Sequence, residues 1–437
     1  MTRTTPMDTS TVSPPSPPSF REAFMFWLKL GWISFGGPAG QIAIMHHEIV
    51  DRKKWLDEER FLHALNYCML LPGPEAQQLA TYIGWLLHKT RGGIAAGVLF
   101  VLPSVFILFG LSSIYIFYGT LPWVAAIFDG LKAAVLAIVL AAVIKIGRKS
   151  LKNRLLTAIA ILSFLAIAIL EIPFPALIFT VGVIGVIGSR FAPGLFLANG
   201  KPGQAVSFAD HHSRPPSLAK NLVLILVFLV LWGIPFLGLY YLLPGSIFAT
   251  EAWFFTKAAF LTFGGAYALL GYIAQAGVEY YGWLTSLQMM DGLGLAETTP
   301  GPLIMVVQFV GFLAGWNHSA ALGPVLGAVT GSLVATYFTF LPSFMFIFLG
   351  APYIERLIGN PRLSAALATI TPAVVGVILN LGVWFGSHIL FEADGFAWFS
   401  ASLAAVSFGL IEWKKVGVIP IIAGCGGLGL LRYLLGF

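Results

Sequence analysis

The sequence predicts an all-α polytopic membrane protein made of two inverted-topology repeats, each with broken or re-entrant half-helices. The first observation is composition: 58% of the 437 residues are hydrophobic, 10% are charged, and the mean hydropathy is +0.86. A water-soluble globule cannot bury that much apolar surface, whereas a bilayer accepts it. The other two observations are a repeat of helix-breaking motifs and a reversal of loop charge between the two copies.

Two motifs that break helices recur at a fixed distance along the chain. Residues 35–38 are FGGP and residues 71–75 are LPGPE, and both motifs lie inside apolar segments. FGG recurs at 263–265 and PGP at 300–302, and the spacing from position 36 to position 264 equals that from position 73 to position 301. We call this spacing the repeat offset. Because Gly and Pro are unfavourable in a helix interior, their recurrence in register indicates one ancestral unit used twice.

The first repeat covers residues 21–189. An apolar segment at 24–45 contains the FGGP break. The runs 61–71 and 76–87 flank residues 72–74 and are shorter than the roughly 20 residues that a membrane-spanning helix needs. We therefore expect a re-entrant hairpin of half-helices whose tip is buried in protein. The remaining candidate helices of this repeat are 92–118, 122–144, 155–170 and 174–188.

Three segments lie outside the first repeat and lead to the second. Residues 1–20 are rich in Pro, Ser and Thr and are expected to form a disordered tail. A polar stretch at 190–220 is expected to be a cytoplasmic linker, and 221–243 is one membrane-spanning helix without a counterpart. The second, inverted repeat covers 251–437. Its candidate helices are 252–276, the short runs around 300–302, 322–350, 363–390, 396–411 and 416–435.

Lys and Arg in short loops predict how the repeats are oriented, because cytoplasmic loops accumulate these residues. Three loops of the first repeat contain Lys or Arg where the second repeat has neither, and two further pairs show the reverse. The five pairs are 46–60 and 277–291, 89–91 and 315–322, 145–154 and 385–396, 119–121 and 356–362, and 171–173 and 414–415. The copies are therefore expected to face opposite ways. Such inverted repeats with broken helices are typical of secondary transporters, with the site between the repeats.

The breaks predict an anion-binding site. A half-helix that begins at Pro74 directs free backbone N–H groups and a partial positive charge toward the hairpin tip. Gly73 and Gly301 mark two such tips. The alternative is that the prolines only kink long helices and the glycines only permit packing, but repetition in register favours the site. The other candidate substrate-binding residues of the breaks are Gly36, Gly37, Pro38, Gly264, Gly265, Gln77, Gln78, Thr298 and Thr299.

Charged residues in the apolar segments are the remaining candidates. Lys29 and Lys257 are separated by the repeat offset, and each central Lys costs about 2.5–3.5 kcal/mol to insert, which suggests that neither is accidental and makes both candidate substrate-binding residues. Lys29 could instead extend to the membrane surface. Glu75, Asp291 and Glu297 are candidates for coupling proton binding to transport, although capping of the helix is sufficient explanation for Glu75.

Several function classes find no support in the sequence. Cys68 and Cys425 lack ligand or disulfide spacing, and the histidines form no metal set, so no metal and no cofactor is expected. Basic and aromatic residues are not interleaved as in nucleic-acid-binding surfaces. Nucleotide-binding and hydrolase motifs are missing, which disfavours an enzyme.

Four sequence blocks are long and specific: FGGPAGQIAIMHHEIVDRKKW, LLPGPEAQQLATYIGW, FTKAAFLTFGGAYALLGYIAQAGVEYYGWL and DGLGLAETTPGPLIMVVQFVGFLAGW. They resemble the chromate ion transporter family in its long two-domain form. The resemblance covers both halves but neither the tail nor the linker. The functional positions that it implies are Gly36, Gly37, Pro38, Glu75, Gln77, Gln78, Lys257, Gly264, Gly265, Glu297, Thr298 and 300–302.

The resemblance implies a bacterial inner-membrane protein that exports chromate and confers chromate resistance, with sulfate as the natural look-alike. Outward movement of a dianion across a membrane that is negative inside gains about 4.6 kcal/mol per 100 mV, which favours export by alternating access. The alternatives are a sulfate or other oxyanion carrier, a channel, and a membrane-embedded enzyme acting on a lipid-linked phosphate. The lipid bilayer is the expected surrounding, and a homodimer is left open.

Overall fold

Almost all of the described chain is helical. The computed structural model describes residues 18–192, 194, 218–263, 265–354, 360–392 and 395–436. Within them, the strands are β1 (Phe391–Glu392) and β2 (Gly395–Phe396), which pair antiparallel. Six helices of the described part are long and apolar enough to cross a membrane, judged by length and composition. The prediction of an all-α, multi-pass membrane protein is confirmed. The expected tail and linker fall mostly outside the described residues.

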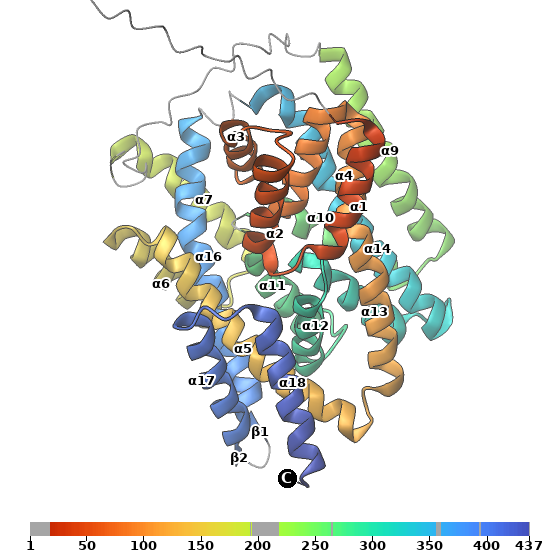
Figure 1. The fold of residues 1–437 in the computed structure, drawn as a ribbon, viewed down its shortest axis with the longest axis vertical. Coiled ribbons are helices and arrows are strands. Elements are labelled where there is room, and N and C mark those ends of the chain that lie inside the picture. The colour runs from red at the N-terminus through yellow and green to blue at the C-terminus, as the bar shows by residue number, and fades with distance from the viewer. Residues whose placement is uncertain are drawn as a thin grey trace, which may run out of the picture.

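The first half opens with a helix that breaks and turns back. α1 (Phe20–Ile33) is followed by the break, by α2 (Gly37–His46) and by a π-helical turn, η1 (His47–Arg52). Gly36 at the break has φ of +88°, a conformation that favours glycine. Figure 1 shows both helices running from this break toward the top of the molecule. The segment predicted at 24–45 is therefore a turned-back pair of helices.

The second motif separates α3 (Glu58–Cys68) from α4 (Glu75–Tyr118). The α4 element is itself two helices, because the backbone leaves the helical region at His88 and at Lys89, where φ is +53°. The two parts pack closely: a Cβ at Gly84 would lie 2.4 Å from the carbonyl oxygen of Gly92. The expected short helix at 76–87 and the longer one at 92–118 are thus both present.

The remaining first-half helices lead to a peripheral crossing. α9 exposes large apolar side chains along its length, and Phe228 is the buried residue that its described part contributes. Such a surface suits lipid contact. The bounds are α5 (Pro122–Ser150), α6 (Arg154–Ala168), α7 (Phe174–Phe191) and α9 (Leu218–Leu242).

The second half repeats the order of the first at its opening. Its π-helical turn, η2 (Gln275–Tyr280), begins and ends one repeat offset after η1. Figure 1 places α2 and α3 toward the top and α12 below the centre. The bounds of the other elements are α10 (Ile247–Leu261), α11 (Ala266–Ala274), α12 (Ser286–Thr298), η3 (Leu303–Met305), α13 (Val306–His318), α14 (Gly323–Gly350), η4 (Ala351–Tyr353), α16 (Pro361–Leu390), α17 (Trp398–Glu412) and α18 (Val418–Leu434).

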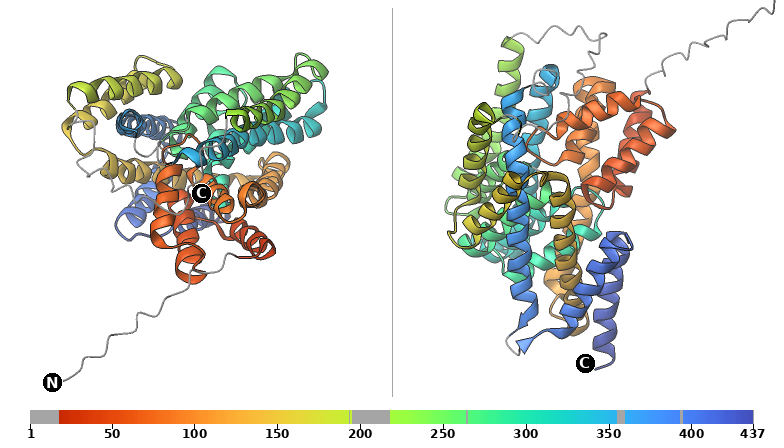
Figure 2. Two further views of the ribbon diagram at one scale, coloured as in Figure 1. Left: turned by 90° about the horizontal axis from the view of Figure 1, so that it is seen from above. Right: turned by 90° about the vertical axis from the view of Figure 1, so that its left-hand side faces the viewer.

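The C-terminal helices of the second half pack against the first half. α16 contacts α5, α6 and α7, and both α17 and α18 contact α5. Figure 2 shows α16 running along much of the long axis, with α17 and α18 near the end that carries the C-terminus. The two halves therefore share one packed interior.

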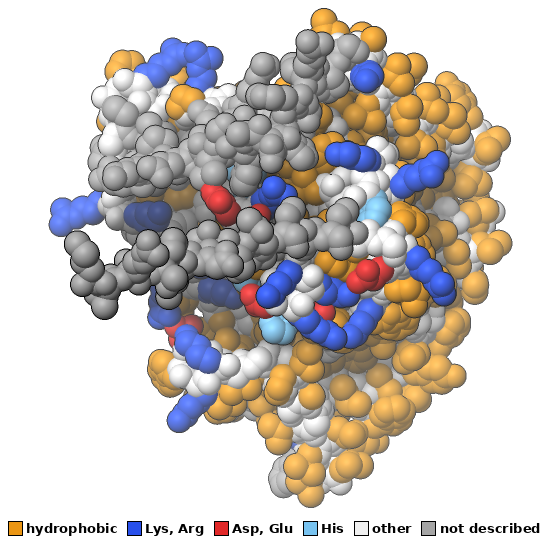
Figure 3. Space-filling view, turned by 45° about the horizontal axis from the view of Figure 1, so that its top comes forward, with side chains coloured by type: hydrophobic (Ala, Val, Ile, Leu, Met, Phe, Trp, Pro, Cys, Tyr) orange, Lys and Arg blue, Asp and Glu red, His pale blue; other side chains and the backbone are white. Residues whose placement is uncertain are grey.

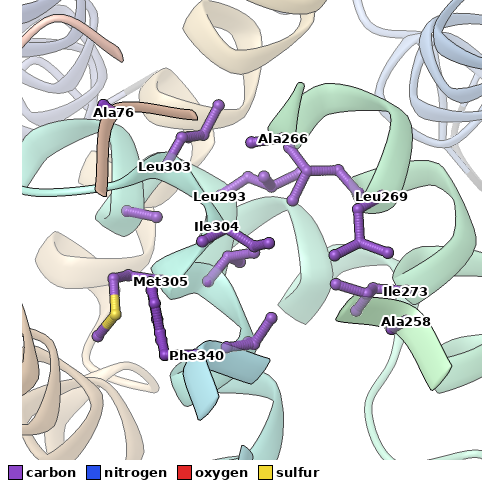
Figure 4. Packing of buried hydrophobic residues seen from close by; sticks show 14 of the residues in the cluster. Ala76, Ala258, Ala266, Leu269, Ile273, Leu293, Leu303, Ile304, Met305 and Phe340 are labelled. Atoms are coloured by element: carbon purple, nitrogen blue, oxygen red, sulfur yellow. The ribbon is translucent and has the colours of Figure 1, made fainter. Parts of the chain in front are cut away.

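An apolar core surrounds the breaks. Ala76 of α4, Ala266 of α11 and Leu303 of η3 are at most 4% exposed and lie together with residues of α12 (Figure 4). Each of these three residues follows a break within two positions. The helix starts are thus held in dry protein, where the field of a helix terminus is weakly screened.

One end of the molecule is basic. Figure 3 shows Lys and Arg side chains gathered on the top face, with apolar surface beside and below them. Arg52 and Lys54 in the loop after α2, and Lys89 and Arg91 at the turn inside α4, are exposed. The loops that carry the positive charge of the first half thus reach the surface.

Candidate functional site

The two halves bind each other through their breaks. The backbone N–H of Gly73 donates to the carbonyl oxygen of Thr262 at 2.9 Å, and the N–H of Gly301 donates to that of Ser34 at 2.8 Å. Thr262 lies one repeat offset after Ser34, and Gly301 lies one repeat offset after Gly73. The bonds are therefore equivalent, and each joins a hairpin tip to the broken helix of the opposite half.

Each tip also lies against a serine of the opposite half. Ser104 follows Pro103, which lies inside α4, and donates from its hydroxyl to the carbonyl oxygen of Pro300. On the other side, a Cβ at Gly73 would lie 2.7 Å from Oγ of Ser343, which follows Pro342. The φ angles of Gly73 and Gly301 are +129° and +102°. Both positions require glycine for conformation and for space.

The donors that remain for an anion come from the first turns of the helices. Because the N–H groups of Gly73 and Gly301 are engaged by carbonyls, the tips themselves hold the halves together. α2, α4, α11 and η3 begin at Gly37, Glu75, Ala266 and Leu303, and none of these four starts has a side-chain cap. The first N–H groups of a helix have no intrahelical partner, so these starts are anion-attracting.

Starts from opposite halves come close to each other. Glu75 is the first residue of α4, and its Oε1 lies 3.9 Å from the Cβ position at Gly265, which precedes α11 and has φ of +99°. The neighbouring Gly264 lies outside the described residues. At the other break, no described atom lies within 4 Å of the Cβ position at Gly37, so the start of α2 borders open space. Pro38 stands in the first turn of α2.

Three glutamines near these helix starts are buried, and two of them donate to backbone carbonyl oxygens. Gln78 donates from Nε2 to the carbonyl oxygen of Pro72 at 2.7 Å, and Gln77 donates to Oγ1 of Thr81 at 3.1 Å. Gln41 donates to the carbonyl oxygens of Ser34, at 3.3 Å, and Gly301. The amide oxygens of all three glutamines are buried without a hydrogen-bond partner among the described groups. Sequence reasoning expected Gln77 and Gln78 but missed Gln41, whose counterpart position holds Leu269.

The predicted threonines lie at the end of α12. Thr298 and Thr299 donate from their hydroxyls to the carbonyl oxygens of Leu295 and Ala296, at 2.7 and 2.9 Å. These bonds satisfy carbonyls that the helix end leaves free. The threonines thus terminate α12 before the Gly301 tip.

The carboxyl groups of α12 are each bound by a tyrosine hydroxyl. Tyr267 of α11 donates to Oε1 of Glu297 at 2.8 Å, and Tyr115 of α4 donates to Oδ2 of Asp291 at 2.9 Å. Nζ of Lys132 lies 3.9 Å from Oδ1 of Asp291. Glu297 and Asp291 are 8% and 4% exposed. Asp291 therefore connects α12 to two helices of the first half, through partners that no sequence motif had indicated.

The two lysines occupy exposed or partly exposed positions on α1 and α10. Lys29 is exposed, and Nζ of Lys257 lies 5.9 Å above the ring centre of Trp253, which is 49% exposed. No hydrogen bond or ion pair within the described part of the chain joins either lysine to the helix starts. The structure thus brings Gly73 to Thr262, Gly301 to Ser34 and Glu75 to Gly265, and within the described residues it shows no such contact for the lysines.

Six helices in the described part are long and apolar enough to cross a membrane, as expected for a multi-pass membrane protein. The chain belongs to the chromate transporter family, whose model matches residues 21–186 and 249–430. The matched segments contain both sets of breaks and leave out the linker and α9. The family is one of transporters and not of enzymes, in agreement with the sequence.

Relatives match the chain over nearly its whole length. It is 31% identical to a chromate transport protein of Pseudomonas aeruginosa over 98% of this chain and 95% of that protein. It is 29% identical to a chromate transport protein of Cupriavidus metallidurans over 95% and 94%, and 28% identical to a probable chromate transport protein of Synechococcus elongatus over 86% and 87%. No solved structure matches the chain.

Proposed function

We propose that this protein exports chromate across the bacterial inner membrane by alternating access and thereby confers chromate resistance. The observation that carries the proposal is the reciprocal pair of bonds between Gly73 and Thr262 and between Gly301 and Ser34. Each bond joins the hairpin tip of one half to the break of the other, and uncapped helix starts follow both tips and both breaks. The choice of chromate as the substrate rests on the membership of the family and on the names of the relatives.

The chemistry of the helix starts suits a tetrahedral dianion. Backbone N–H groups cannot be deprotonated, and the partial positive charge of a helix start is strong where water is excluded. The open space beside Gly37 and the first turn of α4 at Glu75 are the proposed contact points. A single carboxylate beside a dianion is repulsive, so Glu75 is expected to be protonated when chromate binds.

Inverted repeats would make such a site accessible from either side. The residue-for-residue match of η1 with η2, the reciprocal bonds and the lone crossing α9 all support this arrangement. Loop charges support opposite orientations, with the basic face of Figure 3 in the cytoplasm. Rocking of one half against the other around the breaks would expose the site alternately.

Sulfate is the second candidate substrate, because backbone N–H groups recognise charge and shape but not the central atom. Helix starts bind sulfate and phosphate alike. The alternatives of a channel and of a lipid-phosphate enzyme have no specific observation in their favour. A homodimer remains an expectation without a structural argument.

Proteoliposomes with a clamped potassium diffusion potential test the proposal. Purified protein should move chromate toward the positive side, with saturation and with counterflow, which a channel lacks. Sulfate, molybdate and phosphate in excess should compete according to their shape and charge. Protein that carries no chromate under any imposed potential or pH gradient, yet remains folded, would contradict the proposal; faster uptake of sulfate than of chromate would favour the alternative.

A further inference from the structure

Glu251 is a buried carboxyl group that the proposed site does not use. It lies in the second turn of α10, its side chain is 0% exposed, and neither carboxyl oxygen has a hydrogen-bond partner among the described groups. Its Oε1 lies 3.3 Å from the Cβ position at Gly331 of α14. A larger residue at 331 would press on the carboxyl group, so α10 and α14 enclose it directly.

The face of α10 that continues from Glu251 is apolar. Phe255 and Ala258 continue the same face of α10 at helical spacing, and both are 0% exposed. Ser332, next to Gly331, also has a buried hydroxyl without a partner in the described part. In the first half the matching position, one repeat offset earlier, is Ala23, so the packing of the repeat does not itself require a carboxyl group.

No charged group of the packed elements compensates Glu251. α10 packs chiefly on α14, α13, α9 and α11, and none of the ion pairs found in the described chain includes Glu251. The titratable side chains of these elements are directed elsewhere. They are Tyr337 (to the carbonyl oxygen of Leu231), His318 (to that of Gly282), Tyr267 (to Glu297), Tyr272 (stacked on Phe174), Lys257 of α10 itself (over Trp253), and the exposed Lys220, Tyr240 and Tyr241 of α9.

An ionised carboxylate in such a place is costly, because it has lost water without gaining a partner. The group is therefore neutral while α10 and α14 are packed as in the structure. It can release its proton only when water reaches it, which requires the two helices to separate. Protonation of Glu251 is thus coupled to the packing of α10 against α14. The packed state favours the neutral acid, and separation of the helices allows the acid to ionise.

α10 also leads to the proposed substrate site. It ends at Leu261, and the next carbonyl, that of Thr262, accepts the bond from Gly73. Glu251 precedes Thr262 by eleven residues, which is roughly 16 Å along a helix. A movement of α10 that hydrates Glu251 is therefore expected to displace the bond from Gly73 to Thr262, one of the two reciprocal backbone bonds between the halves.

We propose that Glu251 is a proton-binding site that couples proton movement to anion transport. It takes a proton from water on one side while α10 and α14 are apart, carries it as the neutral acid when they pack, and returns it to water after the halves have moved. The inference rests on the proposed function, since it assigns the coupling of that same transporter. It differs from the Glu75 and α12 carboxyls, which border the site or have tyrosine partners.

The test compares wild type with Glu251→Gln in proteoliposomes whose membrane potential is held at zero. Chromate accumulation driven by a pH gradient should fall in Glu251→Gln by roughly tenfold or more, whereas chromate exchange without any gradient should remain. Gln keeps the size of the side chain but cannot carry a proton. Glu279→Gln, at an exposed carboxyl of η2, is the matched control and should keep both activities.

Transport by Glu251→Gln can overturn the inference in two ways. Glu251→Gln could retain pH-driven accumulation, or it could lose exchange as well while remaining folded, which would indicate a structural role. Infrared spectroscopy provides a readout without transport: wild type should show a protonated-carboxyl C=O band that Glu251→Gln lacks, and its absence from wild type also overturns the inference. Wild type that moves chromate under a potential but never under a pH gradient overturns the coupling alone. Wild type that moves none contradicts the proposed function.

Discussion

Gly73 and Thr262 come from different halves of the chain, yet the backbone N–H of Gly73 donates to the carbonyl oxygen of Thr262 at 2.9 Å. Gly301 and Ser34 form the matching bond from the other side. Because each tip depends on the opposite break, the halves cannot separate at the centre without losing both bonds. Movement between the halves must either pivot on this crossing or exchange these bonds for others.

Alanine at the tips should damage both folding and transport. Gly73→Ala and Gly301→Ala place a Cβ at φ of +129° and +102° and against Ser343 or Ser104. Each is expected to cost about 1–3 kcal/mol in backbone strain, before any steric clash. Thermal unfolding in detergent and chromate uptake measure the two effects. Gly110→Ala is the control, because no described atom lies within 4 Å of its Cβ position; equal loss in all three variants would contradict the prediction.

Ser104 and Ser343 should differ although each lies against a hairpin tip of the opposite half. Ser104→Ala removes the donor to the carbonyl oxygen of Pro300 and leaves that buried acceptor unpaired, at an expected cost of about 1–3 kcal/mol. Ser343→Ala removes a hydroxyl that has no partner among the described groups and should be nearly neutral. The measurement is the midpoint of unfolding of each variant. Equal losses of stability in Ser104→Ala and Ser343→Ala would contradict the prediction.

The tyrosine on Glu297 should stabilise the packing of α11 against α12. Tyr267→Phe removes its hydrogen bond and is expected to lower stability by about 1.5–3 kcal/mol if the carboxyl is ionised. Glu297→Gln keeps an oxygen that accepts the bond and should lose less. Tyr118→Phe, at a 54% exposed tyrosine, is the control. The measurement is the unfolding midpoint at several pH values. A larger loss for Glu297→Gln than for Tyr267→Phe would contradict the prediction.

Removal of either lysine should leave chromate affinity nearly unchanged. Lys257→Gln loses the contact with the ring of Trp253, worth about 0.5–1 kcal/mol at an exposed site, and Lys29→Gln loses an exposed charge. The half-saturating chromate concentration is the measurement. A rise of roughly tenfold, equivalent to about 1.4 kcal/mol, for Lys257→Gln alone would show that this amine reaches the anion in another state.

The sequence predicts where the helices break but not which groups of the opposite half form hydrogen bonds with the breaks. Gly36, Gly73 and Gly301 stand out because glycine and proline interrupt apolar runs, and positive φ angles occur at all three. The fold class follows from hydropathy for the same local reason. The bond from Gly73 to Thr262 depends on how two distant segments pack, and no local pattern encodes it.

The residues that sequence reasoning missed share one property. Gln41, Tyr115 and Tyr267 are ordinary helix residues whose importance comes from partners in other elements. Glu251 is a single acidic residue near the start of α10 and belongs to none of the sequence motifs, and its complete burial distinguishes it. The repeat offset could have drawn attention to Gln41 and Glu251, since their counterparts are Leu269 and Ala23.

The crossed bonds also bear on how such a chain could have arisen. A half-length protein with one tip and one broken helix would leave a buried donor and a buried acceptor unmatched inside the membrane, which is unfavourable. Two copies inserted in opposite directions would satisfy both at once. Duplication and fusion, with α9 as the added crossing, would then fix in one gene a pairing that previously depended on two molecules meeting.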